Sequence, residues 1–493
     1  MSRDSDRPRA SDTGSEITTQ VLVLGAGPGG YTAAFRAADL GLDVVLVERH
    51  ETLGGVCLNV GCIPSKALLH VAKVIADAEQ ASEHGVTFGP PTVDLGALRE
   101  WRDGVVGRLT GGLAAMAKQR GVRVVRGEGR LTSANVLEVA GTRITFEHAI
   151  LATGSRALRL PGIPHEDPRV MSSTEALALA EVPRRLLVIG GGIIGLELAT
   201  IYDALGSQVT VVELADQLIP GCDPDLIAPL RRRIAGRYAA IHLRTRIASL
   251  QADEEGLRAT FAHAAGTSGE ASSVVEPAVF DRALVAVGRV PNSDALGLED
   301  TGVAIDERGF VTVDSQLRTS VAHIHAIGDL VGAPMLAHKA THQAKVAAEV
   351  LAGHDVEFDV RGIPSVAYTD PEIAWVGLTE TEAERAGTAY RSVSFPWAAS
   401  GRALASSANG LTKLLVDPES NRVLGAGIVG AGAGELIAAP GLALELEVDT
   451  EDIALTVHAH PTLAETVAFA AEVAEGTVTD LPRARSRVGG REQ

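Results

Sequence analysis

The sequence predicts an α/β fold in which two parallel-sheet domains of one kind are followed by a C-terminal α+β domain. A glycine-rich turn follows an apolar strand-like run twice, once near residue 25 and once near residue 190. After each turn come a helix-like stretch, a second apolar run and an acidic residue. This order indicates parallel sheets built from βαβ units. After residue 355, shorter alternating runs with helical stretches between them indicate the α+β domain.

The first turn carries Gly25, Gly27 and Gly30, and Glu48 ends the next predicted strand. Such glycines let a pyrophosphate approach a helix N-terminus, and the acid accepts a hydrogen bond from a ribose hydroxyl. A glycine-rich turn alone is a weak signal, because ordinary loops also contain it. Strand, glycines, helix, strand and acid together favour a Rossmann-like dinucleotide-binding domain.

The second turn repeats this arrangement with Gly190, Gly192 and Gly195, and its acid is Glu213. The separation between the first glycine and the acid is identical in the two copies, so we expect two dinucleotides, FAD and a nicotinamide. A carboxylate repels a 2′-phosphate, and residues 214–217 contain no arginine. NAD is therefore favoured over NADP.

Cys57 and Cys62 lie five positions apart, and the only other cysteine is Cys222. Pro64 and the helix-forming residues after it place Cys62 near a helix N-terminus, which favours a thiolate and hence a redox-active pair. Two alternatives are a zinc site, which lacks further Cys or His ligands at matching spacing, and two unrelated buried thiols. Cys222 is interpreted as an idle thiol, and no metal is predicted.

Several motifs in this order resemble the flavin-dependent pyridine nucleotide-disulfide oxidoreductase family, and within it the bacterial dihydrolipoamide dehydrogenases. They are residues 53–66, the two glycine turns, and residues 152–154, 326–329, 363–372, 395–403 and 458–465. The resemblance runs from about residue 18 to residue 481. It implies oxidation of protein-bound dihydrolipoyl groups to lipoyl disulfide, with two electrons passing through a Cys57–Cys62 disulfide and FAD to NAD.

The resemblance also assigns roles to individual residues. Cys57 matches the thiol that exchanges with the substrate, and Cys62 matches the thiolate beside the flavin. A thiol attacks a disulfide only as a thiolate, and the matching base is His460, with Glu465 orienting its imidazole. Without the resemblance, His460 reads as a solvated loop histidine.

Further positions match cofactor contacts of the family, and each also has an ordinary structural explanation, such as a surface lysine, a helix glutamate or a polar turn. They are Lys66 and Glu197 near the flavin edge, Thr153, Gly154 and Asp329 along FAD, and Gly288 and Arg289.

The motif order predicts the domain boundaries. Residues 17–155 are the predicted FAD-binding domain, residues 156–283 the inserted NAD-binding domain, residues 284–354 a central domain completing the FAD part, and residues 355–483 the interface or dimerisation domain. Residues 251–277 are expected to be rich in turns. Residues 1–16 and 484–493 are expected to be disordered or loose tails.

A formal net charge of −18 argues against nucleic acid or an anionic membrane surface as partners. The N-terminus lacks the apolar core of a signal peptide, and we expect no membrane-spanning run and a cytoplasmic protein. The resemblance implies a homodimer in which His460 serves the partner's disulfide. It also implies docking to the lipoyl-bearing acyltransferase core of a 2-oxoacid dehydrogenase complex, or to a glycine cleavage carrier.

Two other functions are weighed against this one. A glutathione-type NAD(P)H-dependent reductase usually takes NADP, which Glu213 opposes, and mercuric and large thioredoxin reductases use a C-terminal thiol pair, whereas no cysteine follows Cys222. A non-catalytic docking subunit is opposed by the presence of Cys57, Cys62, His460 and Glu465.

Overall fold

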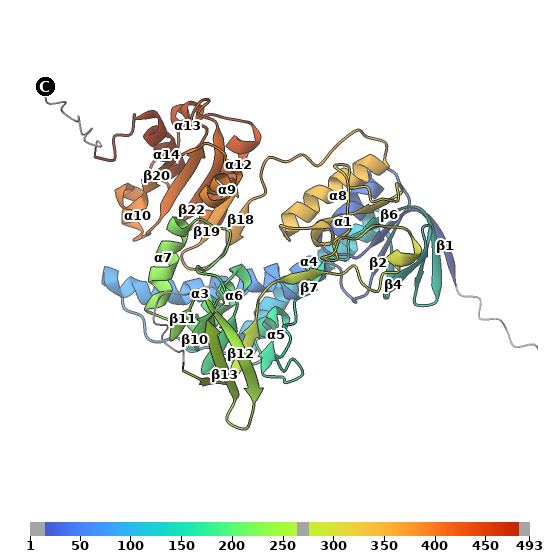
Figure 1. Cartoon of the computed structure of the whole chain (residues 1–493), viewed down its shortest axis with the longest axis horizontal. Coiled ribbons are helices and arrows are strands. Elements are labelled where there is room, and N and C mark those ends of the chain that lie inside the picture. The colour runs from blue at the N-terminus through green and yellow to red at the C-terminus, as the bar shows by residue number, and fades with distance from the viewer. Residues whose placement is uncertain (1–14, 264–275, 483–493) are drawn as a thin grey trace, which may run out of the picture. The chain divides into compact units, whose positions relative to one another are not determined.

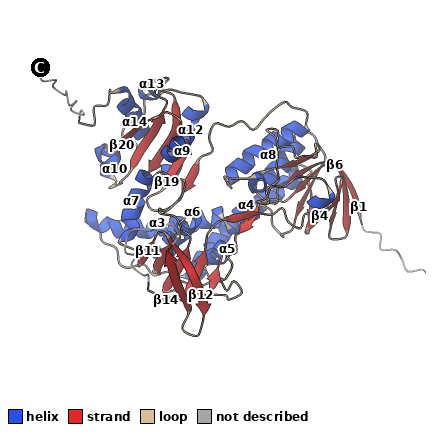
Figure 2. Ribbon diagram, in the orientation of Figure 1, coloured by secondary structure: helices blue, strands red, loops and turns tan. Residues whose placement is uncertain are grey.

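The computed structural model describes residues 15–263 and 276–482. The predicted loose tail 484–493 lies outside these residues, as do residues 1–14 of the predicted N-terminal tail. The chain divides into two compact units. Their helices and strands are drawn in Figures 1 and 2. Within the described residues, unit 1 comprises residues 15–64, 101–156 and 289–359, and unit 2 comprises residues 65–100, 157–263, 276–288 and 360–482.

Unit 1 is built on a sheet with the spatial order β3-β2-β1-β6-β5-β4, and β17 also pairs with β6. The pairs β1–β2, β2–β3, β1–β6 and β6–β17 are parallel, whereas β4, β5 and β6 form an antiparallel meander. The strands are β1 (Glu16–Leu24), β2 (Val44–Glu48), β3 (Arg123–Arg126), β4 (Gly129–Ser133), β5 (Val136–Val139), β6 (Thr142–Leu151) and β17 (Ile324–Ala326).

Helices pack on the parallel part of this sheet because its strands are apolar on both faces, as expected for a buried parallel sheet. Val21, Val23 and Leu46 lie in the core beneath α1, whereas Leu22 and Val45 face the second core. The helical elements are α1 (Pro28–Asp39), α2 (Gly55–Val60), the start of α3 (Cys62–Gln80), most of α4 (Leu95–Gln119), η2 (Leu298–Asp300), η3 (Gly328–Val331) and α8 (Ala337–Leu351).

Unit 2 contains a second parallel sheet, with the order β11-β10-β9-β15-β8. Its members are β8 (Val170–Met171), β9 (Arg185–Ile189), β10 (Gln208–Val212), β11 (Ala240–His242) and β15 (Arg282–Val285), with helices α5 (Ser173–Ala178), α6 (Ile193–Ala204) and α7 (Pro224–Ala235). An antiparallel three-stranded sheet accompanies it, made of β12 (Thr245–Ala252), β13 (Leu257–His263) and β14 (Ala278–Phe280).

The rest of unit 2 is an antiparallel sheet with the order β18-β19-β22-β21-β20 and helices packed on it (Figure 2). Its strands are β18 (Ser365–Ala367), β19 (Ile373–Gly377), β20 (Arg391–Pro396), β21 (Leu411–Val416) and β22 (Val423–Val429). Its helical elements are α9 (Glu380–Ala386), η4 (Trp397–Ala399), α10 (Gly401–Ala405), α11 (Ala433–Leu436), α12 (Ala438–Glu445), α13 (Thr450–Leu455) and α14 (Glu465–Glu475). Two short strands, β7 (Ser155–Ala157) and β16 (Arg289–Pro291), pair where the chain passes between the units, and η1 (Ala81–His84) ends the long α3 segment.

Two local expectations differ from the structure. The stretch 251–277 was expected to be turn-rich, yet its described part includes β13, because Leu257, Ala259 and Phe261 pair across the ladder with β12 and pack into an apolar cluster. No membrane-spanning run was expected, yet one described stretch, Gly55–His84, has the length and apolar content for it. A core helix of a globular protein passes the same test, so this stretch carries no conclusion about a membrane.

Candidate functional site

The first glycine turn can only be made by glycine at two of its three positions. Gly25 has φ +97°, and a Cβ there would lie 2.5 Å from the carbonyl oxygen of Ala152. A Cβ on Gly30 would lie 1.8 Å from the carbonyl oxygen of Gly25. Gly27 is the N-cap of α1 and has no side chain to cap the first-turn N–H groups, which leaves them for an anion.

Glu48 closes this turn from the end of β2. Its Oε2 accepts a hydrogen bond from Ala26 N at 2.8 Å, and its Oε1 accepts one from His50 N at 2.9 Å. Glu48 is 5% exposed. It therefore fixes the turn and stands at the end of β2 where an adenosine ribose is held in dinucleotide folds.

The second turn in unit 2 repeats this geometry. Gly190 has φ +106°, and a Cβ there would lie 2.4 Å from the carbonyl oxygen of Ala286, while a Cβ on Gly195 would lie 2.1 Å from the carbonyl oxygen of Gly190. Glu213 Oε2 accepts from Gly191 N at 2.6 Å, and Oε1 accepts from Ala215 N at 2.7 Å. Gly192 is the N-cap of α6 and, like Gly27, has an extended backbone. Both turns thus fit a dinucleotide pyrophosphate.

The two cysteines lie beside the first turn. Gly54 N donates to Ala26 O at 2.8 Å, and a Cβ on Gly55 would lie 2.6 Å from Gly27 Cα, so the backbone of this segment is pressed against the turn. Cys57 lies half-buried in α2, and Cys62 is the exposed first residue of α3. Cys62 thus stands at the helix N-terminus that the sequence predicted, where the macrodipole favours a thiolate.

Arg289 and Asp329 meet through Ser155, also in unit 1. Ser155 Oγ donates to Asp329 Oδ2 at 2.5 Å, and Arg289 donates from Nε to Ser155 Oγ and from Nη2 to Ser155 O, each at 2.7 Å. Burial lowers the pKa of Arg289, although the negative charges of Asp329 and Cys62 oppose this shift. Ser155 therefore joins Arg289 to Asp329, and both are residues that the family resemblance singled out.

Thr153 and Gly154 lead into this group. Thr153 Oγ1 donates to Asn292 O at 2.9 Å, and Asn292 Nδ2 donates back to Thr153 O at 2.9 Å, while Gly154 has φ +69°. Gly288, in unit 2, has φ +130° and its carbonyl accepts from Leu158 N. The hydrogen bonds between Thr153 and Asn292 hold residues 153–154 against the segment that follows β16.

Lys66 and Glu197 form an ion pair in unit 2. Lys66 Nζ donates to both carboxylate oxygens, at 2.9 and 2.8 Å, and the Glu197 side chain is 5% exposed. Ser65 Oγ and Tyr368 N donate to the same carboxylate at 3.0 and 3.1 Å, and Lys66 Nζ lies 4.4 Å from the centre of the Tyr368 ring. The ammonium is thereby held four residues after Cys62 on α3, one turn along the helix.

His460 and Glu465 form a hydrogen-bonded pair in unit 2. His460 Nδ1 lies 2.9 Å from Glu465 Oε1, and Thr462 N donates to Oε2 at 2.7 Å. Burial alone would raise the pKa of Glu465, but the hydrogen bonds from Thr462 and His460 outweigh it and the pKa is lowered. The imidazole is 79% exposed while the carboxylate is 12% exposed, so Nε2 is available to an incoming thiol.

Ser65, Ser155 and Tyr368 join these groups although sequence reasoning did not name them as site residues. Ser65 and Ser155 directly adjoin named residues, Lys66 and Gly154, which is the only local signal they carry. The structure places Ala340 against Gly29 and Gly328, and Gln343 Oε1 accepts from Gly328 N at 2.8 Å, so this segment is well packed. Cys222 is 2% exposed, and burial raises the pKa of its thiol.

Two nucleotide turns in one chain, with a cysteine pair pressed against the first, define a dinucleotide-dependent dithiol–disulfide oxidoreductase. A family model described as "Pyridine nucleotide-disulphide oxidoreductase" matches residues 19–344, and a model of the dimerisation domain of the same family matches residues 363–471. The chain belongs to the pyridine nucleotide-disulphide oxidoreductase family.

Curated relatives match over nearly the whole chain. A dihydrolipoyl dehydrogenase of Vibrio cholerae is 55% identical over 477 residues, covering 96% of this chain and 99% of the relative. Dihydrolipoyl dehydrogenases of Haemophilus influenzae and Bacillus subtilis are 52% and 44% identical, covering 96% and 94% of this chain and 98% and 97% of those relatives.

Solved structures share the fold. LpdA of Mycobacterium tuberculosis has a TM-score of 0.83 at 26% identity, covering 92% of this chain and 99% of that one. The HOCl-induced flavoprotein disulfide reductase RclA of Escherichia coli has a TM-score of 0.80 at 26% identity, with the same coverage. The predicted architecture, two Rossmann-like domains and a C-terminal α+β dimerisation domain, is confirmed.

Proposed function

We propose that this chain is a dihydrolipoyl dehydrogenase that oxidises protein-bound dihydrolipoyl groups and reduces NAD. The observation that carries the proposal is the 55% identity, over nearly the full length of both chains, to a relative of that activity. The cysteine pair on the first turn and the His460–Glu465 pair supply the residue types the reaction needs.

The cofactors are FAD and NAD, as in relatives of this class. The first turn fits FAD, with Gly25, Gly27, Gly30 and Glu48 around the pyrophosphate and ribose, and the second fits NAD through the equivalent residues. The carboxylate of Glu213, which follows β10, would repel a 2′-phosphate, and this supports NAD over NADP. When bound, FAD would supply a two-electron acceptor for the thiol pair and a hydride donor for the nicotinamide.

The chain's own residues would carry the thiol–disulfide steps. In the oxidised enzyme Cys57 and Cys62 form a disulfide. His460 Nε2 takes the proton of one substrate thiol, and the thiolate attacks Cys57 Sγ, so that a mixed disulfide forms and Cys62 leaves as thiolate. The second substrate thiol then attacks the mixed disulfide as a thiolate, and its proton passes to the leaving Cys57 Sγ, which releases the oxidised lipoyl group and the Cys57 thiol.

Thr153, Gly154, Asp329 and Arg289 would line FAD, and Lys66 and Glu197 its reactive edge. Gly288 would face the nucleotide. We also propose the domain boundaries that the motif order predicts. The FAD part comprises residues 17–155 and 284–354, the NAD part residues 156–283 and the interface domain residues 355–483.

The match to a dimerisation domain supports a homodimer. We propose that His460 acts at the partner subunit's disulfide and that the acidic chain docks on a basic domain of a lipoyl-bearing acyltransferase core, in the cytoplasm. The resemblance to a flavoprotein disulfide reductase keeps a reductase of small disulfides as the second candidate.

One assay separates the two functions. Purified flavin-loaded protein is given dihydrolipoamide with NAD, or oxidised glutathione with NADPH, and reduced nucleotide is followed by absorbance. Turnover with the first pair at least about a hundredfold faster than with the second supports the proposal. Faster turnover with the second pair would contradict it.

A further inference from the structure

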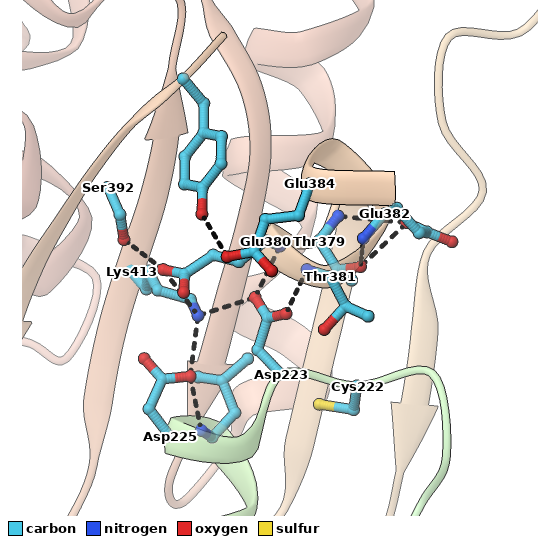
Figure 3. A network of polar contacts seen from close by, with 12 residues as sticks. Cys222, Asp223, Asp225, Thr379, Glu380, Thr381, Glu382, Glu384, Ser392 and Lys413 are labelled. Carbon is cyan, nitrogen blue, oxygen red and sulfur yellow. Dashed lines mark hydrogen bonds and ion pairs between the residues drawn. The ribbon is translucent and has the colours of Figure 1, made fainter. Parts of the chain in front are cut away.

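Lys413 is a buried ammonium that faces three carboxylates in unit 2. It lies in β21 with its side chain 1% exposed, and Nζ lies 2.7 Å from Asp223 and Asp225 and 3.4 Å from Glu380 (Figure 3). Burial alone would lower the pKa of Lys413, but its hydrogen bonds to Asp223 and Asp225 outweigh this and raise the pKa. The group therefore stays charged, and its loss would leave the buried carboxylate of Asp223 without its compensating charge.

The start of α7 docks on the antiparallel sheet at this point. In the ladder, Lys413 stands directly opposite Gly427 of β22. A Cβ on Gly427 would lie 2.2 Å from Leu226 Cδ1, so only glycine lets Leu226 reach the sheet. Asp223, the N-cap of α7, also accepts from the N–H groups of Glu380 and Thr381 at 3.2 and 3.4 Å. Charge and shape together hold the start of α7 in one place.

Asp223 is the last residue of a segment that contacts the second nucleotide turn. The segment runs from Leu214 to Asp223, directly after Glu213. Near its middle, Ile219 N donates to Gly191 O at 2.9 Å, and Leu218 packs on Gly191. Cys222 N then donates to Ile219 O at 3.2 Å, just before Asp223.

The backbone N–H and carbonyl of Gly191 are thus held by Glu213 and by the segment that follows it: Glu213 accepts from the N–H, and Ile219 donates to the carbonyl. Gly191 lies between Gly190 and Gly192, within the turn proposed to hold the pyrophosphate. The position of Asp223 therefore determines the position of Ile219. Because Ile219 holds Gly191, it also determines the position of the turn. We infer that Lys413 is a positioning residue for the pyridine nucleotide, fixing the Gly190–Gly192 turn through the Asp223 anchor; the inference rests on the proposed use of NAD by this turn.

On the other face of β21, Thr412 contacts the helix that begins at Glu465. Thr412 Oγ1 lies 2.8 Å from Thr466 Oγ1 and accepts from Trp397 Nε1 at 3.0 Å. Thr466 follows Glu465 at the start of α14. Neighbouring residues of β21 therefore point to opposite faces, Lys413 toward the start of α7 and Thr412 toward the helix that bears Glu465. Perturbing Lys413 should act on the nucleotide alone.

The test measures NAD binding directly on the flavin-loaded dimer by titration calorimetry, with steady-state kinetics beside it. We expect Lys413→Met to raise the Kd and KM for NAD about tenfold or more, the loss expected for one charge-assisted anchor, with the KM for dihydrolipoamide unchanged. Gly427→Val, which displaces Leu226 without changing any charge, should raise the Kd in the same direction. Arg185→Met is the matched control, because its ion pair with Asp281 lies at the opposite end of β9 from the turn.

Should Lys413→Met not fold, Asp225→Asn removes one partner that is 44% exposed, and it is expected to raise the Kd for NAD by a smaller factor. Unchanged NAD affinity in folded Lys413→Met and Gly427→Val, or an equal rise in Arg185→Met, overturns the inference. An equal rise in the KM values for NAD and for dihydrolipoamide, together with a lower thermal stability, also overturns the inference. A purely structural role would give that result. Wild-type protein that binds NAD but does not oxidise dihydrolipoamide contradicts the proposed function alone.

Discussion

His460 Nδ1 lies 2.9 Å from Glu465 Oε1, and the pair joins an exposed imidazole to a largely buried carboxylate. The carboxylate is also held by Thr462 N at 2.7 Å, so its position does not depend on the imidazole. Such a fixed acceptor selects the tautomer that leaves Nε2 as the base and stabilises the imidazolium formed when a thiol gives up its proton.

Replacing Glu465 by Gln should therefore lower kcat for dithiol oxidation about a hundredfold, because the imidazole loses its charged orienting partner. The Kd for NAD should stay unchanged, which calorimetry checks. A variant with wild-type kcat would show that the carboxylate does not support the base.

The same carboxylate gives a stability prediction. Its folded pKa is lowered, so its contribution is fully present above the unfolded pKa, about 4.3, and is lost as the pH falls through the folded value. Thermal melts of wild type and Glu465→Gln should differ most near neutral pH and converge in acid. A gap that widens below pH 4 would contradict this sign.

Mixing two inactive variants tests whether His460 serves the partner subunit. His460→Ala and Cys62→Ser chains are refolded together, and mixed dimers then contain one site with both groups if the base acts across the interface. Activity should recover to about a quarter of wild type, because half of the dimers are mixed and each has one working site. No recovery in verified mixed dimers would place base and disulfide on the same chain.

The two glycine turns should fail separately. Gly30→Ala places a methyl on the Gly25 carbonyl and should yield protein without bound flavin, seen as loss of the yellow absorbance. Gly195→Ala creates the same clash with Gly190 in the second turn, and should keep the flavin while weakening NAD binding at least about tenfold. If Gly195→Ala loses flavin and keeps NAD affinity, the assignment of the turns is reversed.

A buried histidine away from these groups predicts an acid-sensitive core. His325 is 1% exposed, and neither ring nitrogen has a hydrogen-bond partner among the described residues. Burial, with the positive charge of Arg318, lowers the pKa of His325 to about 4. This stabilises the neutral form, so the folded state loses stability as the pH falls from the unfolded value near 6.5 toward 4.

His325→Leu should remove this loss. Relative to wild type, the variant should gain about 2 kcal/mol more at pH 5 than at pH 8, as a shift of 1.5 pH units below the unfolded pKa implies. Denaturant unfolding at the two pH values measures it. An equal difference in unfolding free energy at pH 5 and pH 8 would contradict the prediction, because it would show that folding does not lower the pKa of His325.

Much of the site could be predicted because its signals are local. Gly25, Gly30, Gly190 and Gly195 answer steric demands set within a few residues and one neighbouring strand, so spacing alone revealed them. Cys62 lies at the helix start that Pro64 indicated. His460 and Glu465, five residues apart, were found through a family motif.

The remainder depends on contacts between distant segments. Tyr368 reaches Glu197, and Lys413 reaches Asp223, across more than a hundred residues, and nothing in their own neighbourhood marks them. The strand at Leu257–His263 was missed because its composition resembles a loop, while its pairing with β12 decides its conformation. Long-range pairing is invisible to local periodicity.

The central claim is that a thiol pair made by Cys57 and Cys62 receives the substrate's electrons before the nucleotides do. It is tested most directly by the rate at which flavin-loaded Cys62→Ser protein oxidises dihydrolipoamide with NAD, with NAD affinity measured on the same sample. We predict turnover at least about a thousandfold below wild type with unchanged NAD affinity. Turnover of Cys62→Ser at the wild-type rate would contradict the account.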